Sequence, residues 1–196
     1  MNKTATTLCL ATCALTLGLG SWFARAESDG AERVFRDARD WTVHIRNSVD
    51  QSFVEDEQGY FEGAGFVVDA ARGWVVTNAH VASRSYSQVQ LSFRSGPTLP
   101  AKRLYVDPYL DLAVLAYDPA KRGPAQAEPS LACDRVPDVG HPVGAFGHPY
   151  GMRYTGTRGI VSAVTSRYGA DLLQTDAPIN AGNSGGPLIS LETGKV

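Results

Sequence analysis

The sequence predicts an all-β protein made of two consecutive β units, and three features carry that prediction. Apolar and polar residues alternate in several short segments, as at Trp41, Val43 and Ile45. Glycine, proline, asparagine and aspartate separate these segments at short intervals. A stretch with three prolines and little apolar content, residues 117–130, divides the segments into two groups. We therefore expect an N-terminal β-barrel over 41–116, a linker over 117–130 and a C-terminal β-barrel over 131–196.

Each expected element follows from its local pattern. Apolar residues at helical spacing after Ser28 predict a short helix up to Asp40, within an N-terminal segment of residues 27–40. Alternating or continuous apolar residues then predict strands in the first unit around 41–45, 65–68, 74–77, 89–93 and 112–117. The second unit is expected to hold strands around 142–146, 159–164, 172–175 and 187–189.

The first 26 residues have the three regions of a secretory signal peptide. Lys3 provides the positive start, Leu8–Gly20 is uncharged and largely apolar, and Ala24–Ala26 offers an A-x-A cleavage site. We expect cleavage there, export to the periplasm or out of the cell, and no stable membrane insertion; an uncleaved N-terminal anchor is the alternative. Cleavage would leave Cys133 alone, so no internal disulfide is expected.

Composition and charge argue against a nucleic-acid partner. The 196 residues are 43% hydrophobic and 19% charged, which is typical of a globular protein. The formal net charge is −2, and lysine and arginine are scattered along the chain. Nucleic-acid binding depends on clustered positive charge, so we expect no nucleic-acid partner.

The most informative motif is GNSGGP, from Gly182 to Pro187. Six such fixed letters arise by chance in about one chain in 10⁵ at average residue usage. Glycines beside a serine allow the backbone to approach a ligand closely, and the N–H groups of Gly182 and Ser184 could converge as an oxyanion hole. A glycine-rich hairpin with an incidental serine is the alternative. Pro187 stands where the helix of a nucleophile elbow would begin, which excludes that motif.

A nucleophilic serine needs a histidine that takes its proton. The chain has four histidines. His44 is expected to be solvated on the polar side of a strand, whereas His141 and His148 each precede a proline in a glycine-rich loop. His80 directly follows a buried strand, where a side chain emerges at a barrel edge. We therefore select His80 as the base, with a buried structural histidine as the alternative.

The carboxylate that orients this histidine is expected to be Asp111. It directly precedes the apolar run Leu112–Leu115, so it is expected to lie at the start of a buried strand. Asp107 is the rival, but Pro108 follows it and a role in a turn suffices to explain it. The order His80, Asp111, Ser184 is that of chymotrypsin and differs from subtilisin and the α/β-hydrolases.

At these residues the chain resembles the HtrA (Deg-type) periplasmic serine proteases of the chymotrypsin-like clan. The resemblance covers most of residues 41–196 and rests on six motifs: TNAHV around His80, DLAVL from Asp111, QTDAPINAGNSGGPL from Gln174, GAGFVV from Gly63, FGHPYG from Phe146 and GIVSAV from Gly159.

The resemblance implies a chymotrypsin-like double β-barrel with its active site between the barrels. It implies that His80 is general base and acid, Asp111 its orienter and Ser184 the nucleophile, with the Gly182 and Ser184 N–H groups as oxyanion hole. It further implies an endopeptidase for unfolded exported polypeptides, with no metal or cofactor. A homotrimer through Phe35 or Trp41 is left open.

Two departures qualify this expectation. Pro178 lies six residues before the serine, where trypsin-like members carry the acid that selects Lys or Arg, so we expect cleavage after small or medium aliphatic residues. Few residues follow Ser184, so we expect a truncated second barrel and no PDZ domain. A catalytically incompetent, chaperone-like binding protein and a non-functional fragment are therefore the alternatives to an active enzyme.

Overall fold

The computed structural model describes residues 30–53, 56–123 and 127–196. The expected signal peptide lies outside the described residues. Within the described part of the chain, no helix is both long and apolar enough to span a bilayer.

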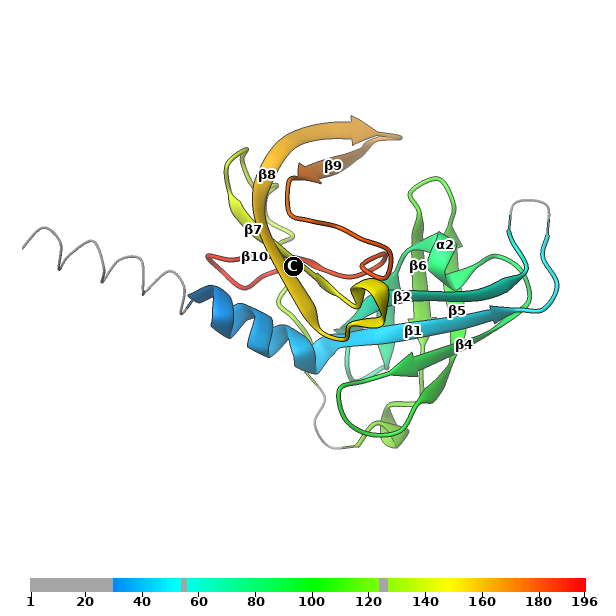
Figure 1. The fold of residues 1–196 in the computed structure, drawn as a ribbon. Coiled ribbons are helices and arrows are strands. Elements are labelled where there is room, and N and C mark those ends of the chain that lie inside the picture. The colour runs from blue at the N-terminus through cyan, green and yellow to red at the C-terminus, as the bar shows by residue number, and fades with distance from the viewer. Residues whose placement is uncertain (1–29, 54–55, 124–126) are drawn as a thin grey trace, which may run out of the picture.

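Six antiparallel strands close into a barrel in the order β1-β2-β3-β6-β5-β4 (Figure 1). β1 pairs with β2 on one side and with β4 on the other, which closes the barrel. Their bounds are β1 Thr42–Val49, β2 Gly59–Asp69, β3 Trp74–Thr77, β4 Ser87–Ser92, β5 Leu99–Asp107 and β6 Leu112–Ala116. A single helical turn, α2 (Ala79–Ala82), follows β3.

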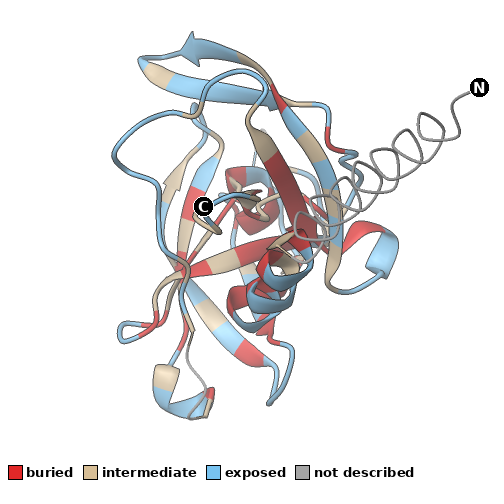
Figure 2. Cartoon of the chain, turned by 90° about the vertical axis from the view of Figure 1, so that its left-hand side faces the viewer, coloured by how far each residue is buried: buried red, intermediate tan, exposed pale blue. Residues whose placement is uncertain are grey.

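The second half of the chain forms an open four-stranded antiparallel sheet in the order β10-β7-β8-β9. Its strands are β7 Pro142–Gly147, β8 Thr155–Arg167, β9 Ala170–Thr175 and β10 Leu188–Ser190. Two 3₁₀ turns, η1 (Pro119–Lys121) and η2 (Pro149–Gly151), precede β7 and β8. Largely exposed residues form the β8–β9 hairpin, which extends away from the barrel (Figures 1 and 2). The expected all-β fold with two consecutive β units is confirmed; the division at residues 117–130 stays a prediction.

One apolar core joins the barrel to the second sheet and the leading helix, which occupies the described residues 30–41. Trp41 is buried in this core, and the ring of Phe35 stacks on Phe146 of β7 at 5.7 Å between centroids. Figure 2 shows the helix with its buried side toward the strands and its exposed side outward. The two aromatic residues that the sequence offers for a trimer contact are therefore engaged within the chain.

The structure corrects the expectation that His44 is solvated. Its side chain is only 5% exposed, although it lies on the polar side of the alternation in β1. The His44 ring contacts His148 at 5.1 Å between centroids in an edge-to-face arrangement. The loop after β7 covers the outer face of the barrel at His44, so both faces of β1 are buried in its first half, where alternation alone predicts one, whereas Arg46 further along the outer face is exposed.

Candidate active site

His80 and Asp111 lie in contact at one edge of the barrel. His80 belongs to α2, and its Nδ1 atom lies 2.8 Å from Oδ2 of Asp111. The backbone N–H of His80 donates to the other carboxylate oxygen at 3.0 Å. Both side chains remain accessible, with exposed fractions of 57% and 45%, so Asp111 keeps partial contact with solvent.

Asp111 holds its position through an unusual backbone conformation. Its φ of 52° lies in the left-handed region, which aspartate tolerates better than most residues. The side-chain amide of Asn78 donates to the Asp111 carbonyl at 2.8 Å. Asn78 stands at the N-terminal end of α2, so one residue ties the turn that carries His80 to the turn that carries Asp111. Sequence reasoning missed this role, although Asn78 lies within the TNAHV motif.

The other end of α2 is fixed by two charged residues that sequence reasoning also missed. The Arg103 guanidinium on β5 donates to the carbonyls of Ala82 (3.2 Å), Ser83 (2.7 Å) and Ser85. Burial lowers the pKa of Arg103, and the charge of nearby Asp56 partly offsets that effect. These contacts lock the segment directly after His80 onto the barrel.

Asp56 is the second charged residue that fixes this end of α2, and we call Arg103 and Asp56 together the anchor of α2. Its Oδ2 atom accepts from the Ser83 hydroxyl (2.7 Å), from the Arg84 N–H (2.8 Å) and from both the N–H and the hydroxyl of Ser85. Partial burial opposes ionisation of Asp56, but these hydrogen bonds outweigh it and lower the pKa of the carboxyl. The carboxylate therefore stays ionised and holds the turn after α2.

Ser184 lies in a tight loop that packs against the segment carrying His80. The Ser184 carbonyl accepts from the N–H of Ala64 on β2 at 2.8 Å, which ties the loop to the barrel. Gly185 adopts a φ of 79°, and a β-carbon there would collide with the Thr77 hydroxyl and the Ala64 carbonyl. The glycine following Ser184 is thus required both for the backbone conformation and for the close approach of the two β units.

The loop leaves the two expected oxyanion-hole donors free of backbone partners. In the described ranges, neither the Gly182 N–H nor the Ser184 N–H donates to a backbone carbonyl, whereas the Asn183 N–H donates to Asn180 and the Gly186 N–H to Asn183. Gly182 has a φ of 102°, a conformation in which a β-carbon would strike the His148 carbonyl.

The structure brings together the expected residues only in part. His80 and Asp111 are hydrogen-bonded. No hydrogen bond joins the His80 ring to the Ser184 hydroxyl among those that the described residues form. In enzymes without substrate, such bonds are often long and tighten when substrate binds.

His148 supports the serine loop from the second sheet. Its N–H donates to the Gly182 carbonyl at 3.2 Å, and the Tyr150 N–H donates to the Ala181 carbonyl at 2.9 Å. The Tyr154 N–H donates to His148 Nδ1 at 3.1 Å, which fixes a neutral ring with its hydrogen on Nε2. Burial and the neighbouring His44 lower the pKa of His148 to about 4, so the ring is neutral at pH 7.

Asp107, the rival of Asp111 in the sequence, has a structural role in a turn. Asp107 Oδ1 accepts from the N–H groups of Tyr109 and Leu110, which is the turn role that Pro108 suggests. Cys133 is exposed in a loop.

Two packed β units define the chymotrypsin-like class, with the histidine and aspartate candidates on the first unit and the serine candidate on the second. Comparison with known proteins narrows this class. Residues 63–196 match the family described as "Trypsin-like peptidase domain". The chain belongs to this family and is a protease domain of the HtrA type.

Named relatives and solved structures agree with that assignment. The chain is 36% identical to "Protease Do-like 1, chloroplastic" of Arabidopsis thaliana, with 80% of this chain and 38% of the relative covered. It is 38% identical to "Periplasmic serine endoprotease DegP" of Salmonella typhimurium, with 66% and 27% covered. The serine endoprotease from Yersinia pestis superposes with a TM-score of 0.68 at 30% identity, covering 85% of this chain and 55% of that one.

An HtrA-type protease solved with a tripeptide gives a TM-score of 0.71 at 27% identity, covering 85% of this chain and 52% of that one. This chain thus spans about a quarter to two fifths of the two curated relatives.

Proposed function

We propose that the chain is a serine endopeptidase in which Ser184 is the nucleophile, His80 the general base and acid, and Asp111 the residue that orients His80. The observation that carries this proposal is the double contact between Asp111 and His80 at the edge against which the Ser184 loop packs. A carboxylate bound to Nδ1 selects the tautomer whose Nε2 can accept the serine proton.

The proposed reaction proceeds through an acyl-enzyme. Ser184 Oγ attacks the scissile carbonyl carbon while its proton moves to His80 Nε2. The Gly182 and Ser184 N–H groups stabilise the oxyanion, consistent with their lack of backbone partners within the described chain. His80 then protonates the leaving amine as the C–N bond breaks, and it later activates the water that hydrolyses the acyl ester on Ser184.

The proposed substrates are exported, unfolded polypeptides cleaved after small or medium aliphatic residues. Relatives named as periplasmic serine endoproteases support export and polypeptide hydrolysis. Pro178 supports the specificity, because no carboxylate stands there to select Lys or Arg. Preferential cleavage after Arg or Lys in a peptide library would refute the specificity without touching the activity.

The test combines turnover with active-site labelling. Hydrolysis of an unfolded protein such as reduced lactalbumin is measured for the chain and for Ser184→Ala. Both proteins are also treated with a fluorophosphonate, and the labelled residue is located by fragmentation mass spectrometry. An adduct on Ser184 and loss of turnover in the variant are expected. Unchanged turnover in Ser184→Ala would refute Ser184 as the nucleophile.

A second candidate function, binding of unfolded polypeptides without hydrolysis, is favoured by one observation: the His80 ring and the Ser184 hydroxyl are not hydrogen-bonded in the described structure. This candidate predicts folded protein without Ser184 labelling, whose capture of the reduced lactalbumin is the same for the chain and for Ser184→Ala. The proposed enzyme predicts labelling.

A further inference from the structure

A second serine–histidine–carboxylate arrangement lies in the C-terminal half, apart from His80. The Oγ atom of Ser190 is 2.8 Å from Nε2 of His141. On the other side of the ring, Nδ1 of His141 is 3.7 Å from Oε2 of Glu192, which is too long for a hydrogen bond but places a carboxylate beside Nδ1. The order serine, imidazole, carboxylate is that of a hydrolase triad with glutamate as third member.

The hydrogen bonds around Ser190 are compatible with a hydroxyl that donates to His141. The Thr193 N–H donates to Ser190 Oγ at 3.1 Å, so the hydroxyl already accepts one hydrogen bond. Its own hydrogen is then free to be donated to His141 Nε2. That assignment leaves the ring hydrogen on Nδ1, which is the atom that faces Glu192. In this tautomer Nε2 can take a proton from the serine.

Backbone pairing holds the three residues in place. Ser190 ends β10, where it pairs with Val143 of β7, and His141 directly precedes β7. The Leu191 N–H donates to the Pro142 carbonyl at 3.0 Å, and the Val161 N–H donates to the His141 carbonyl at 2.9 Å. The serine and the histidine therefore stand on adjacent strand ends rather than on a free loop.

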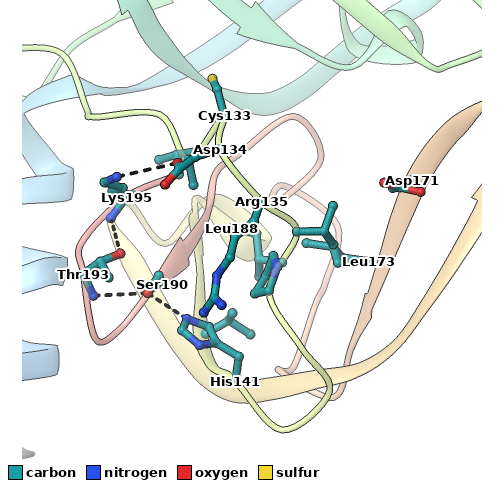
Figure 3. A pocket seen from close by; sticks show the side chains of 15 residues that line it. Cys133, Asp134, Arg135, His141, Asp171, Leu173, Leu188, Ser190, Thr193 and Lys195 are labelled. Carbon is teal, nitrogen blue, oxygen red and sulfur yellow. Dashed lines mark hydrogen bonds and ion pairs between the residues drawn. The ribbon is translucent and has the colours of Figure 1, made fainter.

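His141 and Ser190 line a cavity of about 510 Å³, a size that accommodates a small organic ligand (Figure 3). Val143, Leu173 and Leu188 supply apolar wall. The Arg135 side chain also lines the cavity, and it forms neither an ion pair nor a hydrogen bond with the described residues. The site thus combines a hydroxyl, a base, apolar surface and an unpaired positive charge.

We propose that Ser190 is a second nucleophile, which acts on small esters with short acyl groups and does not depend on Ser184. Ser190 Oγ attacks the ester carbonyl carbon and its proton passes to His141 Nε2, while the Arg135 guanidinium stabilises the negative charge on the carbonyl oxygen. The C–O bond then breaks, the leaving alcohol takes the proton from His141, and acyl-Ser190 remains. Water, deprotonated by His141, hydrolyses that ester and restores the serine.

The experiment uses p-nitrophenyl acetate and a fluorophosphonate on the chain, Ser184→Ala, Ser190→Ala and the double variant. Trypsin leaves both serines in one peptide, residues 168–195, so fragmentation must localise each adduct. Ser184→Ala is expected to keep a Ser190 adduct and ester hydrolysis. The double variant is expected to hydrolyse the ester at least about tenfold more slowly than Ser184→Ala alone.

The outcomes separate this proposal from the proposed peptidase. Labelling of Ser184 alone, with no Ser190 adduct in folded Ser184→Ala, would overturn the second site and leave the peptidase intact. Labelling of Ser190 alone would support the second site and count against the peptidase.

Glu192→Gln, at an exposed side chain, provides a variant with little risk to folding. It is expected to slow Ser190 labelling and shift the pH profile of that labelling, with Glu192→Asp restoring part of the rate. An unchanged rate and pH profile would contradict the positioning role of Glu192.

Discussion

Asp111 binds His80 twice, through Oδ2 to the ring Nδ1 and through Oδ1 to the backbone N–H. One carboxylate thereby fixes both the orientation of the imidazole and the turn of α2 that carries it. Because both side chains are about half exposed, the pair contributes orientation more than stability.

Asp111→Asn tests that orientation. Asparagine keeps the shape of the side chain, but its amide can donate to Nδ1 and thus favour the wrong tautomer of His80. If the proposed peptidase mechanism holds, we expect kcat to fall by roughly 10⁴, as in other His-carboxylate hydrolases. The free energy of unfolding should change by less than about 1 kcal/mol. A variant that retains wild-type kcat would contradict the assigned role of Asp111.

Arg103→Met tests the anchor of α2. Methionine retains much of the buried side-chain volume but leaves the carbonyls of Ala82, Ser83 and Ser85 without their charged donor. We expect a loss of about 1–3 kcal/mol in the free energy of unfolding, measured by urea denaturation. Arg33→Met, at an exposed position of the leading helix, is the matched control and should stay within about 0.5 kcal/mol of wild type. Equal losses in both variants would argue against the anchor.

Comparing Gly185→Ala with Gly169→Ala separates the stability lost to a steric collision from the stability lost to backbone strain. Gly185 and Gly169 have nearly equal φ angles of 79° and 81°, yet only at Gly185 would a β-carbon collide with the other β unit. Gly169→Ala should cost about 1–2 kcal/mol for the left-handed conformation alone. Gly185→Ala should cost a further 1–3 kcal/mol or so and displace Ser184. Thermal unfolding of the two variants checks the difference, and equal melting temperatures would show that the contact is not tight.

The fold was predictable because it depends on local signals, and the His80–Asp111 contact was predictable because a nucleophilic serine requires a histidine and a carboxylate that orients it. Strand alternation, the buried run after Asp111 and the GNSGGP letters each lie within a few residues of the feature they predict. β5 was missed because its burial alternates weakly and Pro100 stands near its start. Its importance lies in Arg103, which reaches residues about twenty positions away. Such long-range contacts leave no periodic pattern in the sequence.

His44 shows a second limit of local patterns. Alternation along β1 correctly separates two faces, but it does not reveal that a second element covers the polar one. The covering residue is His148, 104 positions later in the numbering, and the two rings meet where the barrel and the second sheet pack together. Burial of this pair makes the stability of the interface depend on pH.

The sign of that dependence follows from the His148 pKa of about 4, lowered first by burial and then by the positive charge of His44. In the unfolded chain a histidine titrates at about pH 6.5. Between these values the unfolded state binds a proton that the folded state does not, so stability falls as pH decreases from about 6.5 to 4. His148 alone should remove about 3 kcal/mol over this window. His44, whose pKa burial also lowers against the opposing charge of Glu62, adds in the same direction.

Urea denaturation at several pH values between 4 and 7.5 measures this loss. His148→Asn is the informative variant, because an amide oxygen can replace Nδ1 as acceptor of the Tyr154 N–H while it cannot take up a proton. The variant should have a shallower slope of unfolding free energy against pH in this window, even if its stability at pH 7.5 is lower than that of wild type. His141→Asn, at the less buried histidine that precedes β7, is the control and should leave most of the slope in place. If His148→Asn retains the full wild-type slope, the acid sensitivity belongs to other groups, and His148 is not the residue through which low pH loosens the support of the Ser184 loop.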